Sequence, residues 1–217
     1  MKRGFFITLD GPDGCGKTTQ AGKLVRALSR MGCRPLHTRE PGGTVFAERL
    51  RDLLLDSRQR IAPMTELFLY EAGRAQHVRD VLAPALRRGR VVVCERFTDA
   101  TTAYQGYGRK LDLDMVRDMN AAASLGIVPD LTLVLDLPAR TGLARARRPG
   151  KNDRMENETM DFHRRVRQGY LALARAHPER IRVIPALGSP GAVHRRVLAA
   201  VAARLGKACG RRALRTG

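Results

Sequence analysis

The sequence predicts a single α/β domain in which helices cover both faces of a parallel sheet of about five strands. Three observations lead to this fold class. Short apolar runs of residues that favour strands recur along the chain, segments with apolar residues at helical spacing lie between them, and no Pro/Ser/Gly-rich linker divides the chain. Strands that alternate with helices are joined by right-handed crossovers, which make the strands parallel. With 217 residues, the chain is long enough to bury one sizeable core.

The expected elements follow in order from the N-terminus. Residues 5–9 (FFITL) form an apolar run that predicts a buried strand, and the glycine-rich residues 11–16 predict a loop directly after it. Apolar residues then recur at helical spacing from Ala21 to Met31, and Gly32 is the expected end of this helix. Further strands are expected at residues 91–94, 131–137 and 181–184, with a weaker one at 35–38.

Composition limits the class of protein. The hydrophobic fraction is 43% and the charged fraction is 28%, which is typical of a folded globular domain and not of a disordered chain. No apolar run approaches the ~18 residues that a membrane-spanning helix needs, so neither a membrane span nor an export signal is expected. The four cysteines form no CxxC pair, which favours a reduced protein in the cytoplasm.

The loop after the first expected strand carries a phosphate-binding motif. It reads Gly11-Pro12-Asp13-Gly14-Cys15-Gly16-Lys17-Thr18, which matches GxxxxGK[ST] between a predicted strand and a predicted helix. In such a loop the backbone N–H groups surround the phosphates, and the helix N-terminus adds partial positive charge. Lys17 is expected to reach the β- and γ-phosphates, and the Thr18 hydroxyl to bind Mg²⁺. The motif predicts ATP or GTP binding, with Thr19 as a further contact.

Four further motifs resemble those of one family. Residues 38–44 read TREPGGT, residues 67–74 read LFLYEAGR, residues 95–97 read ERF and residues 103–106 read AYQG. In this order they resemble the motifs of thymidylate kinases, and the resemblance extends over about residues 4–203. It implies a P-loop nucleoside-monophosphate-kinase fold, ATP-dependent phosphorylation of dTMP to dTDP with Mg²⁺ in deoxynucleotide biosynthesis, and a homodimer. The dimer seam would involve a helix at about residues 64–88 and the segment 112–125.

The resemblance also implies roles in binding the acceptor. Asp13 would accept a hydrogen bond from the 3′-hydroxyl of the sugar, and the Tyr104 ring would exclude a ribose 2′-hydroxyl. Phe68 would stack on the thymine ring, although its helical spacing alone would favour packing in the core. The remaining implied contacts are Arg39 on the acceptor phosphate, Arg74 on a base carbonyl, and Thr101 and Gln105 on the pyrimidine edge.

Arginines are expected to balance the charge of the transferred phosphoryl group. Arg96, close after the third long apolar run, would lie between the donor and acceptor phosphates. Residues 140–154 contain six basic residues and resemble the mobile lid of the bacterial type, whose phosphate loop has no arginine, in agreement with Gly14. Arg145 is assigned to ATP binding and Arg147 and Arg148 to catalysis; which of the three closes over the phosphates stays open.

Glu95 departs from the family pattern, in which aspartate is usual. With Thr18 it is assigned to Mg²⁺, and its extra methylene would move the carboxylate by about 1 Å. A reduced turnover, which Glu95→Asp would restore, is therefore the expectation. Tyr107 and Glu71 also depart from the commonest residues. They leave open an alternative substrate, namely another pyrimidine deoxynucleoside monophosphate or one modified at the 5-position.

The charge of the chain suggests an alternative of a different class. Forty basic and 21 acidic residues give a formal net charge of +19, which points to a polyanionic partner. Residues 1–205 are expected to form the kinase domain and residues 206–217 a disordered basic tail. A nucleic-acid-binding P-loop ATPase is the alternative, but the sequence has no RNP-type aromatic cluster or helicase-like second motif set. Nucleic-acid binding is therefore expected to be at most weak and non-specific, through the tail.

Overall fold

The five expected strands form one parallel sheet. They are β1 (Phe5–Asp10), β2 (Pro35–Arg39), β3 (Val91–Glu95), β4 (Leu131–Asp136) and β5 (Ile181–Pro185), in the spatial order β2-β3-β1-β4-β5. Every neighbouring pair of strands is parallel. The structure is a computed structural model and describes residues 3–146 and 153–208. The predicted fold class, α/β with about five parallel strands, is confirmed.

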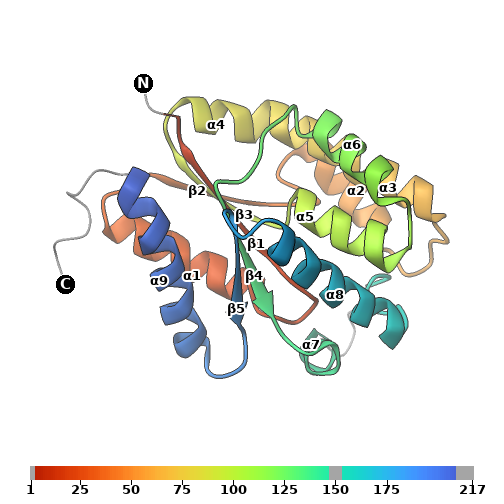
Figure 1. The fold of residues 1–217 in the computed structure, drawn as a ribbon. Coiled ribbons are helices and arrows are strands. Elements are labelled where there is room, and N and C mark those ends of the chain that lie inside the picture. The colour runs from red at the N-terminus through yellow and green to blue at the C-terminus, as the bar shows by residue number, and fades with distance from the viewer. Residues whose placement is uncertain (1–2, 147–152, 209–217) are drawn as a thin grey trace.

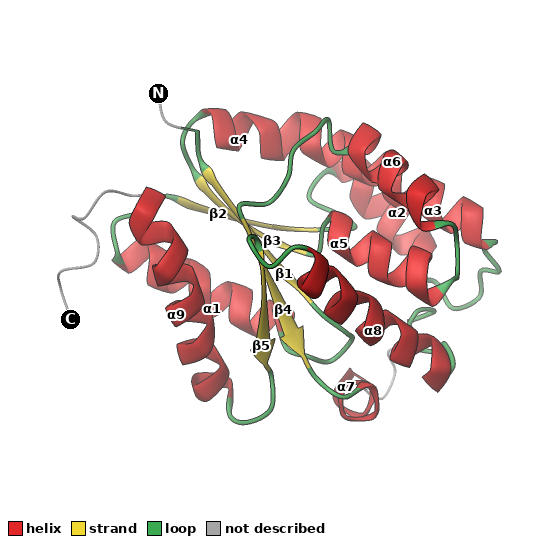
Figure 2. Cartoon of the chain, viewed as in Figure 1, coloured by secondary structure: helices red, strands yellow, loops and turns green. Residues whose placement is uncertain are grey.

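Helices cover both faces of the sheet (Figure 1). Helices α1 (Lys17–Arg30) and α9 (Pro190–Ala208) pack together on one face. The other helical segments lie on the opposite face or at the sheet's carboxyl edge, as Figure 2 shows. They are α2 (Val45–Leu55), α3 (Pro63–His77), η1 (Val78–Leu82), α4 (Ala83–Arg87), α5 (Thr98–Thr101), η2 (Thr102–Gly108), α6 (Leu113–Ala123), α7 (Ala139–Ala146) and α8 (Met160–Ala176), where η1 and η2 are π-helical.

The central strands are mostly apolar because both of their faces are covered. All five residues of β3 are buried, as are the last five of β1. Ile7 and Leu9 face α1 and α9, whereas Phe6 faces η1 and α4 and packs edge-on against Phe97, with ring centroids 5.0 Å apart. This two-sided burial explains why the runs in the sequence are continuous rather than alternating.

The register of the sheet brings three functional segments together. Leu9, just before the phosphate loop, pairs with Glu95 of β3, and Glu95 in turn pairs with Arg39 of β2. Because all strands are parallel, their carboxyl ends lie at one edge, and ligands of such sheets bind in the crevice outside that edge. The fold therefore positions the phosphate loop, the TREPGGT segment and the ERF segment around one crevice.

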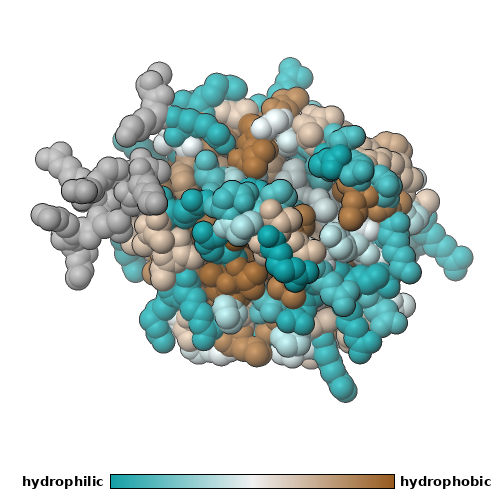
Figure 3. All heavy atoms as spheres, in the orientation of Figure 1, coloured by the Kyte–Doolittle hydropathy of each residue, from teal (hydrophilic) through white to brown (hydrophobic). Residues whose placement is uncertain are grey.

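The surface is predominantly hydrophilic on the side seen in Figure 3, with smaller apolar patches among charged side chains. Within residues 3–146 and 153–208, no helix is long and apolar enough to cross a membrane.

Candidate active site

The carboxyl edge of the sheet opens into a cleft of about 240 Å³. Its walls come from the phosphate loop, the loop after β2, helices α2 and α3, residues 95–104 and residues 153–156. Five cationic side chains line it, and burial together with Arg39 and Arg96 lowers the pKa of Arg51 below its usual value. Such crowding of like charges is relieved by an anion. The five are Lys17, Arg39, Arg51, Arg74 and Arg96.

The phosphate loop has the backbone geometry that its glycines predict. Gly11, Gly14 and Gly16 have φ angles of 129°, 68° and 95°, which residues other than glycine rarely adopt. Helix α1 begins directly after the loop, at Lys17. The Lys17 ammonium donates to the carbonyl oxygens of Gly11 and Pro12 at 3.0 and 2.9 Å. The loop is thus folded around its lysine, and the ammonium group lies within the cleft lining.

Gly14 allows α7 to approach the phosphate loop closely. A Cβ atom built at Gly14 would overlap the carbonyl oxygen of Gly142, and a Cβ at Gly142 would overlap the carbonyl oxygen of Asp13. An arginine at position 14 is therefore incompatible with this packing. The first part of the basic segment 140–154 lies in that space instead.

Asp13, Arg96 and Tyr104 form one hydrogen-bonded cluster. Arg96 Nη2 lies 2.5 Å from Asp13 Oδ1, and the Tyr104 hydroxyl donates to Asp13 Oδ2 at 2.8 Å. Burial opposes ionisation of the Asp13 carboxyl, but Arg96 and then Lys17 outweigh it and hold its pKa below the usual value. Arg96 has a φ angle of 67°, which is rare for a side-chain-bearing residue and aims its guanidinium over the Tyr104 ring, 4.6 Å from the centroid.

Two arginines of the cleft lining lie beside the TREPGGT loop. Arg39 is half-exposed and donates to Glu48 at 2.9 Å. Arg51 of α2 donates to the carbonyl oxygen of Pro41 at 3.1 Å and lines the same cleft. The sequence reasoning missed Arg51, because only the docking of α2 brings it to the site.

Arg74 is the centre of a buried network. Its guanidinium donates to Glu40, Glu71, Asn120 and Thr101 at 2.7 to 2.8 Å. A guanidinium has five N–H donors. The described contacts use four of them, so one N–H of Nη2 is left for a ligand. Glu40 also accepts from His77 at 2.9 Å. The TREPGGT loop is thereby tied to α3.

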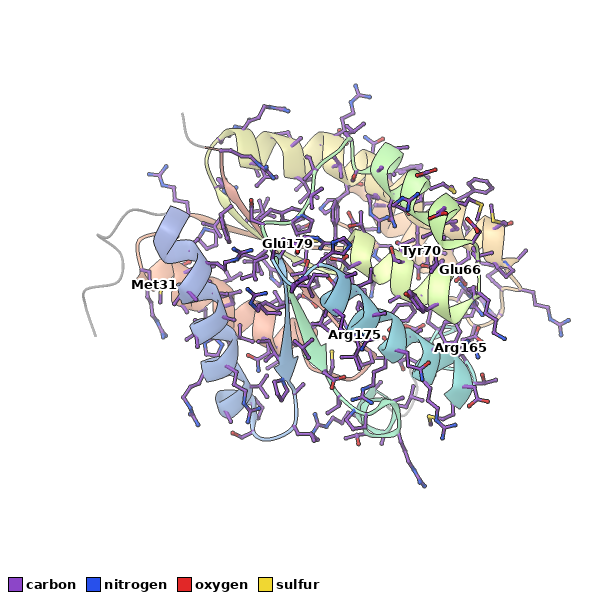
Figure 4. All side chains as sticks on the ribbon, viewed as in Figure 1. Met31, Glu66, Tyr70, Arg165, Arg175 and Glu179 are labelled. Carbon is purple, nitrogen blue, oxygen red and sulfur yellow. The ribbon has the colours of Figure 1, made fainter. Side chains whose placement is uncertain are left out.

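The structure corrects the assignment of Phe68. Its side chain is 55% exposed and does not line the cleft, whereas Tyr70 does. Successive residues of an α-helix are about 100° apart, so positions 68 and 70 point to nearly opposite sides of α3. Tyr70 lies on the same face as Arg74, four residues later, and as Glu66, its neighbour in Figure 4. Tyr70 is therefore the aromatic candidate for contact with the base. Its (i, i+4) spacing to Arg74 is the feature of the sequence that could have indicated this.

Thr101 and Gln105 occupy different environments. Thr101 lines the cleft, and its hydroxyl oxygen accepts from Arg74. Gln105 is buried outside the cleft lining, and its Nε2 donates to Glu66 Oε1 at 2.8 Å. Contact of Gln105 with a base therefore stays a prediction, while its observed partner is Glu66.

Comparison with known proteins decides the family. A model of the thymidylate kinase family matches residues 9–197. The chain belongs to the thymidylate kinase family. It is 54% identical over 200 residues to a thymidylate kinase of Synechococcus sp. (strain JA-2-3B'a(2-13)), covering 92% of this chain and 95% of that protein. It is 47% identical over 204 residues to a thymidylate kinase of Deinococcus radiodurans, covering 94% of this chain and 99% of that protein.

A solved structure supports the fold of this family member. The crystal structure of thymidylate kinase from Ehrlichia chaffeensis matches with a TM-score of 0.75 at 32% identity, covering 91% of this chain and 97% of that one. The chain is therefore an enzyme, a kinase with a P-loop nucleoside-monophosphate-kinase fold.

The oxygen atoms of Thr18 and Glu95 are suited to binding Mg²⁺, the metal that membership of this family implies. The Thr18 hydroxyl donates to Glu95 Oε2 at 2.5 Å, directly after Lys17 at the start of α1. Hydroxyl and carboxylate oxygens are the ligands that Mg²⁺ prefers. The other oxygen of Glu95 lies 3.0 Å from Nε2 of His37, a residue that sequence reasoning did not single out.

The basic segment of the kinase is described only in part. Arg145 donates to the carbonyl oxygen of Ala186 at 3.5 Å, and the backbone of Ala146 lies next to Gly14 of the phosphate loop. Arg147 and Arg148 lie outside the described residues. Beyond them, Arg154 is buried, donates to the carbonyl oxygen of Leu54 at 2.9 Å and lies 2.6 Å from Glu66 Oε2.

Proposed function

We propose that this kinase transfers the γ-phosphoryl group of ATP to the 5′-phosphate of dTMP and produces dTDP. The observation that carries the proposal is the position of Arg96. Its guanidinium contacts Asp13 of the phosphate loop and lines the same cleft as Tyr70 and Arg74. A nucleotide held with its base at Tyr70 would present its phosphate to Arg96. Membership of the thymidylate kinase family supports dTMP as this nucleotide.

At the phosphate end, the chain's own side chains would balance the charge of two anions brought together. Lys17 would leave the carbonyl oxygens of Gly11 and Pro12 and donate to the β- and γ-phosphates, while Arg96 bridges donor and acceptor. Arg39 and Arg51 would hold the acceptor phosphate. Thr18 and Glu95 would hold Mg²⁺, which when bound neutralises charge on the β- and γ-phosphates.

At the nucleoside end, four groups would select the sugar and base. The Asp13 carboxylate, kept ionised by Arg96 and Lys17, would accept from the 3′-hydroxyl. The Tyr104 ring, fixed by its bond to Asp13, would occupy the space that a 2′-hydroxyl needs. Tyr70 would stack on the pyrimidine, and the remaining N–H of Arg74 would donate to a base carbonyl.

Release of ADP from ATP and Mg²⁺ tests the acceptor. The panel is dTMP, dUMP, 5-hydroxymethyl-dUMP, UMP, dCMP, AMP and single-stranded DNA. We expect dTMP to give the highest kcat/KM and UMP to fail, because Tyr104 lies beside Asp13 in the cleft. A higher kcat/KM for a 5-modified deoxyuridylate would replace dTMP as the substrate, and stimulation by DNA alone would contradict the proposal.

Replacement of Tyr70 tests the corrected base contact. Tyr70→Ala is expected to raise KM for dTMP by about tenfold, because stacking on a base contributes roughly 1–3 kcal/mol, and to leave KM for ATP within about twofold. Phe68→Ala is the matched control on the same helix and should change KM for dTMP by less than about twofold, since its side chain lies outside the cleft. The reverse ranking of the two variants would reinstate Phe68 as the base contact.

We further propose a homodimer formed by α2, α3 and α6. Large apolar side chains of these helices are exposed, namely Phe46, Phe68 and Leu113 at 48%, 55% and 41%. Exposed apolar groups on adjacent helices are typical of an interface between chains. Helix α3 packs against both α2 and α6, and α3 and α6 are the two segments that the sequence assigned to the seam. Light scattering on the purified chain tests this pairing.

The remaining assignments concern ATP and the cell. Arg145 would contact the ATP phosphates, because the end of α7 lies against the phosphate loop. A cytoplasmic location suits the free thiols of Cys15 and Cys94. The lid role of residues 140–154, with Arg147 and Arg148, stays a proposal from the sequence. The tail was expected at residues 206–217, but α9 extends to Ala208, so the tail and its weak nucleic-acid binding stay proposals for residues 209–217.

A further inference from the structure

His37 of β2 makes a contact that the proposed roles do not use. Its Nε2 lies 3.0 Å from Glu95 Oε1, while the second carboxylate oxygen of Glu95 accepts from the Thr18 hydroxyl at 2.5 Å. The side chain of His37 is 36% exposed and that of Glu95 is 12% exposed. Thr18, His37 and Glu95 also line one common cavity beside the phosphate loop. The Glu95 carboxylate is therefore held at both oxygens, once by the loop and once by the imidazole.

The strand register explains how the imidazole reaches this carboxylate. In the β2–β3 pair, His37 lies opposite Val93 and Arg39 lies opposite Glu95. His37 is thus the diagonal neighbour of Glu95 on the same face, a distance that only a long side chain spans. Glutamate has one methylene more than aspartate, which extends its reach by about 1 Å. The longer side chain is what allows one carboxylate to contact both Thr18 and His37.

The chemistry of the pair assigns the proton. An ionised carboxylate only accepts hydrogen bonds, so Nε2 of His37 is the donor. With Oε1 engaged by His37, rotation of the carboxylate about its last bond is restrained, and Oε2 stays at Thr18. Groups that orient a metal ligand in this way contribute strongly to metal affinity.

We propose that His37 is a positioning residue for the phosphoryl transfer: it holds the Glu95 carboxylate against Thr18, so that glutamate functions in this chain where aspartate is usual. This inference rests on the proposed function. It predicts the opposite of the expectation drawn from the sequence, because Glu95→Asp would lose the contact with His37 and slow the reaction rather than speed it.

Two substitutions of His37 separate positioning from packing. Glutamine places its amide nitrogen near Nε2 and can still donate to Glu95, whereas asparagine is one methylene shorter and cannot. The first measurement uses no acceptor: binding of a fluorescent ATP analogue is titrated with Mg²⁺. We expect His37→Asn to raise the Mg²⁺ concentration for half-maximal binding by about tenfold, and His37→Gln to stay within about twofold of the parent.

The second measurement is a double-mutant cycle with Glu95→Asp, read both by this titration and by steady-state rates with dTMP. We expect Glu95→Asp and His37→Asn each to lower kcat with KM for dTMP within about twofold, and the double variant to be no worse than either single one. Circular dichroism establishes that each variant is folded; if His37→Asn is not, His37→Ala takes its place beside His37→Gln.

The outcomes are distinguishable from failure of the proposed function. An unchanged Mg²⁺ titration for His37→Asn, equal losses for His37→Asn and His37→Gln, additive effects in the double variant, or a faster Glu95→Asp enzyme would each overturn the role of His37. If dTMP proves not to be the acceptor, the titration without acceptor still reports on His37, because it requires only nucleotide binding.

Discussion

Arg96→Ala is expected to lower kcat with dTMP by about 10³-fold or more, the range found when an arginine that stabilises a transferred phosphoryl group is removed. The guanidinium lies 2.5 Å from Asp13 and 4.6 Å from the centre of the Tyr104 ring, so its position is fixed before substrate binds. A preorganised charge of this kind acts most strongly where negative charge develops. Steady-state kinetics with saturating ATP and dTMP measure the effect.

Arg96→Lys is the informative companion to this variant. Lysine keeps the charge but lacks the planar fork that contacts two phosphates, so we expect it to recover only a small part of the rate. Arg117→Ala on α6, where the side chain is 69% exposed, serves as the control and should retain the parent kcat. A loss of less than about tenfold for folded Arg96→Ala would remove Arg96 from the reaction.

Lys17→Met is expected to lower kcat/KM for ATP by about 10³-fold. In the structure the ammonium donates to two carbonyl oxygens of its own loop, which keep it in place until phosphates replace them. Methionine matches the length of the stem but supplies neither charge nor donor. The change is measured by initial rates over a range of ATP concentrations, with unfolding temperature as a check that the loop still folds.

Lys23→Met, six residues later on α1, is the matched control because it removes the same charge away from the cleft. Its rates should equal those of the parent. If Lys17→Met retained a kcat/KM within about tenfold of the parent, the phosphate loop would bind ATP without its lysine and the proposed role would be lost.

The order of the elements was predictable because it depends on local patterns. Buried strands of a parallel sheet are apolar along their length, so residues 5–9, 91–94 and 131–137 were evident, and helical periods between them implied the crossovers. The phosphate loop was equally evident, since its glycines and Lys17 are consecutive in the chain. The family followed from motifs of the same local kind.

Residues brought together from distant segments were harder to predict. Arg51 and His37 belong to no motif, and each reaches the site only through the docking of α2 or the register of β2 on β3. The choice between Phe68 and Tyr70 depended on which face of α3 meets the cleft. Two residues that are two positions apart in an α-helix point to nearly opposite sides of it, so only one of the two rings can point into the cleft.

The sequence by itself determined the fold class, the family and the chemistry at the phosphate loop, because these reside in consecutive residues. Only the tertiary structure decided which aromatic ring of α3 lines the cleft, that Arg74 donates four of its five N–H groups to protein partners, and that Glu95 is held by His37. The physical reason is that such contacts depend on the orientation of one element relative to another. That orientation is set by packing across the whole core rather than by any single segment.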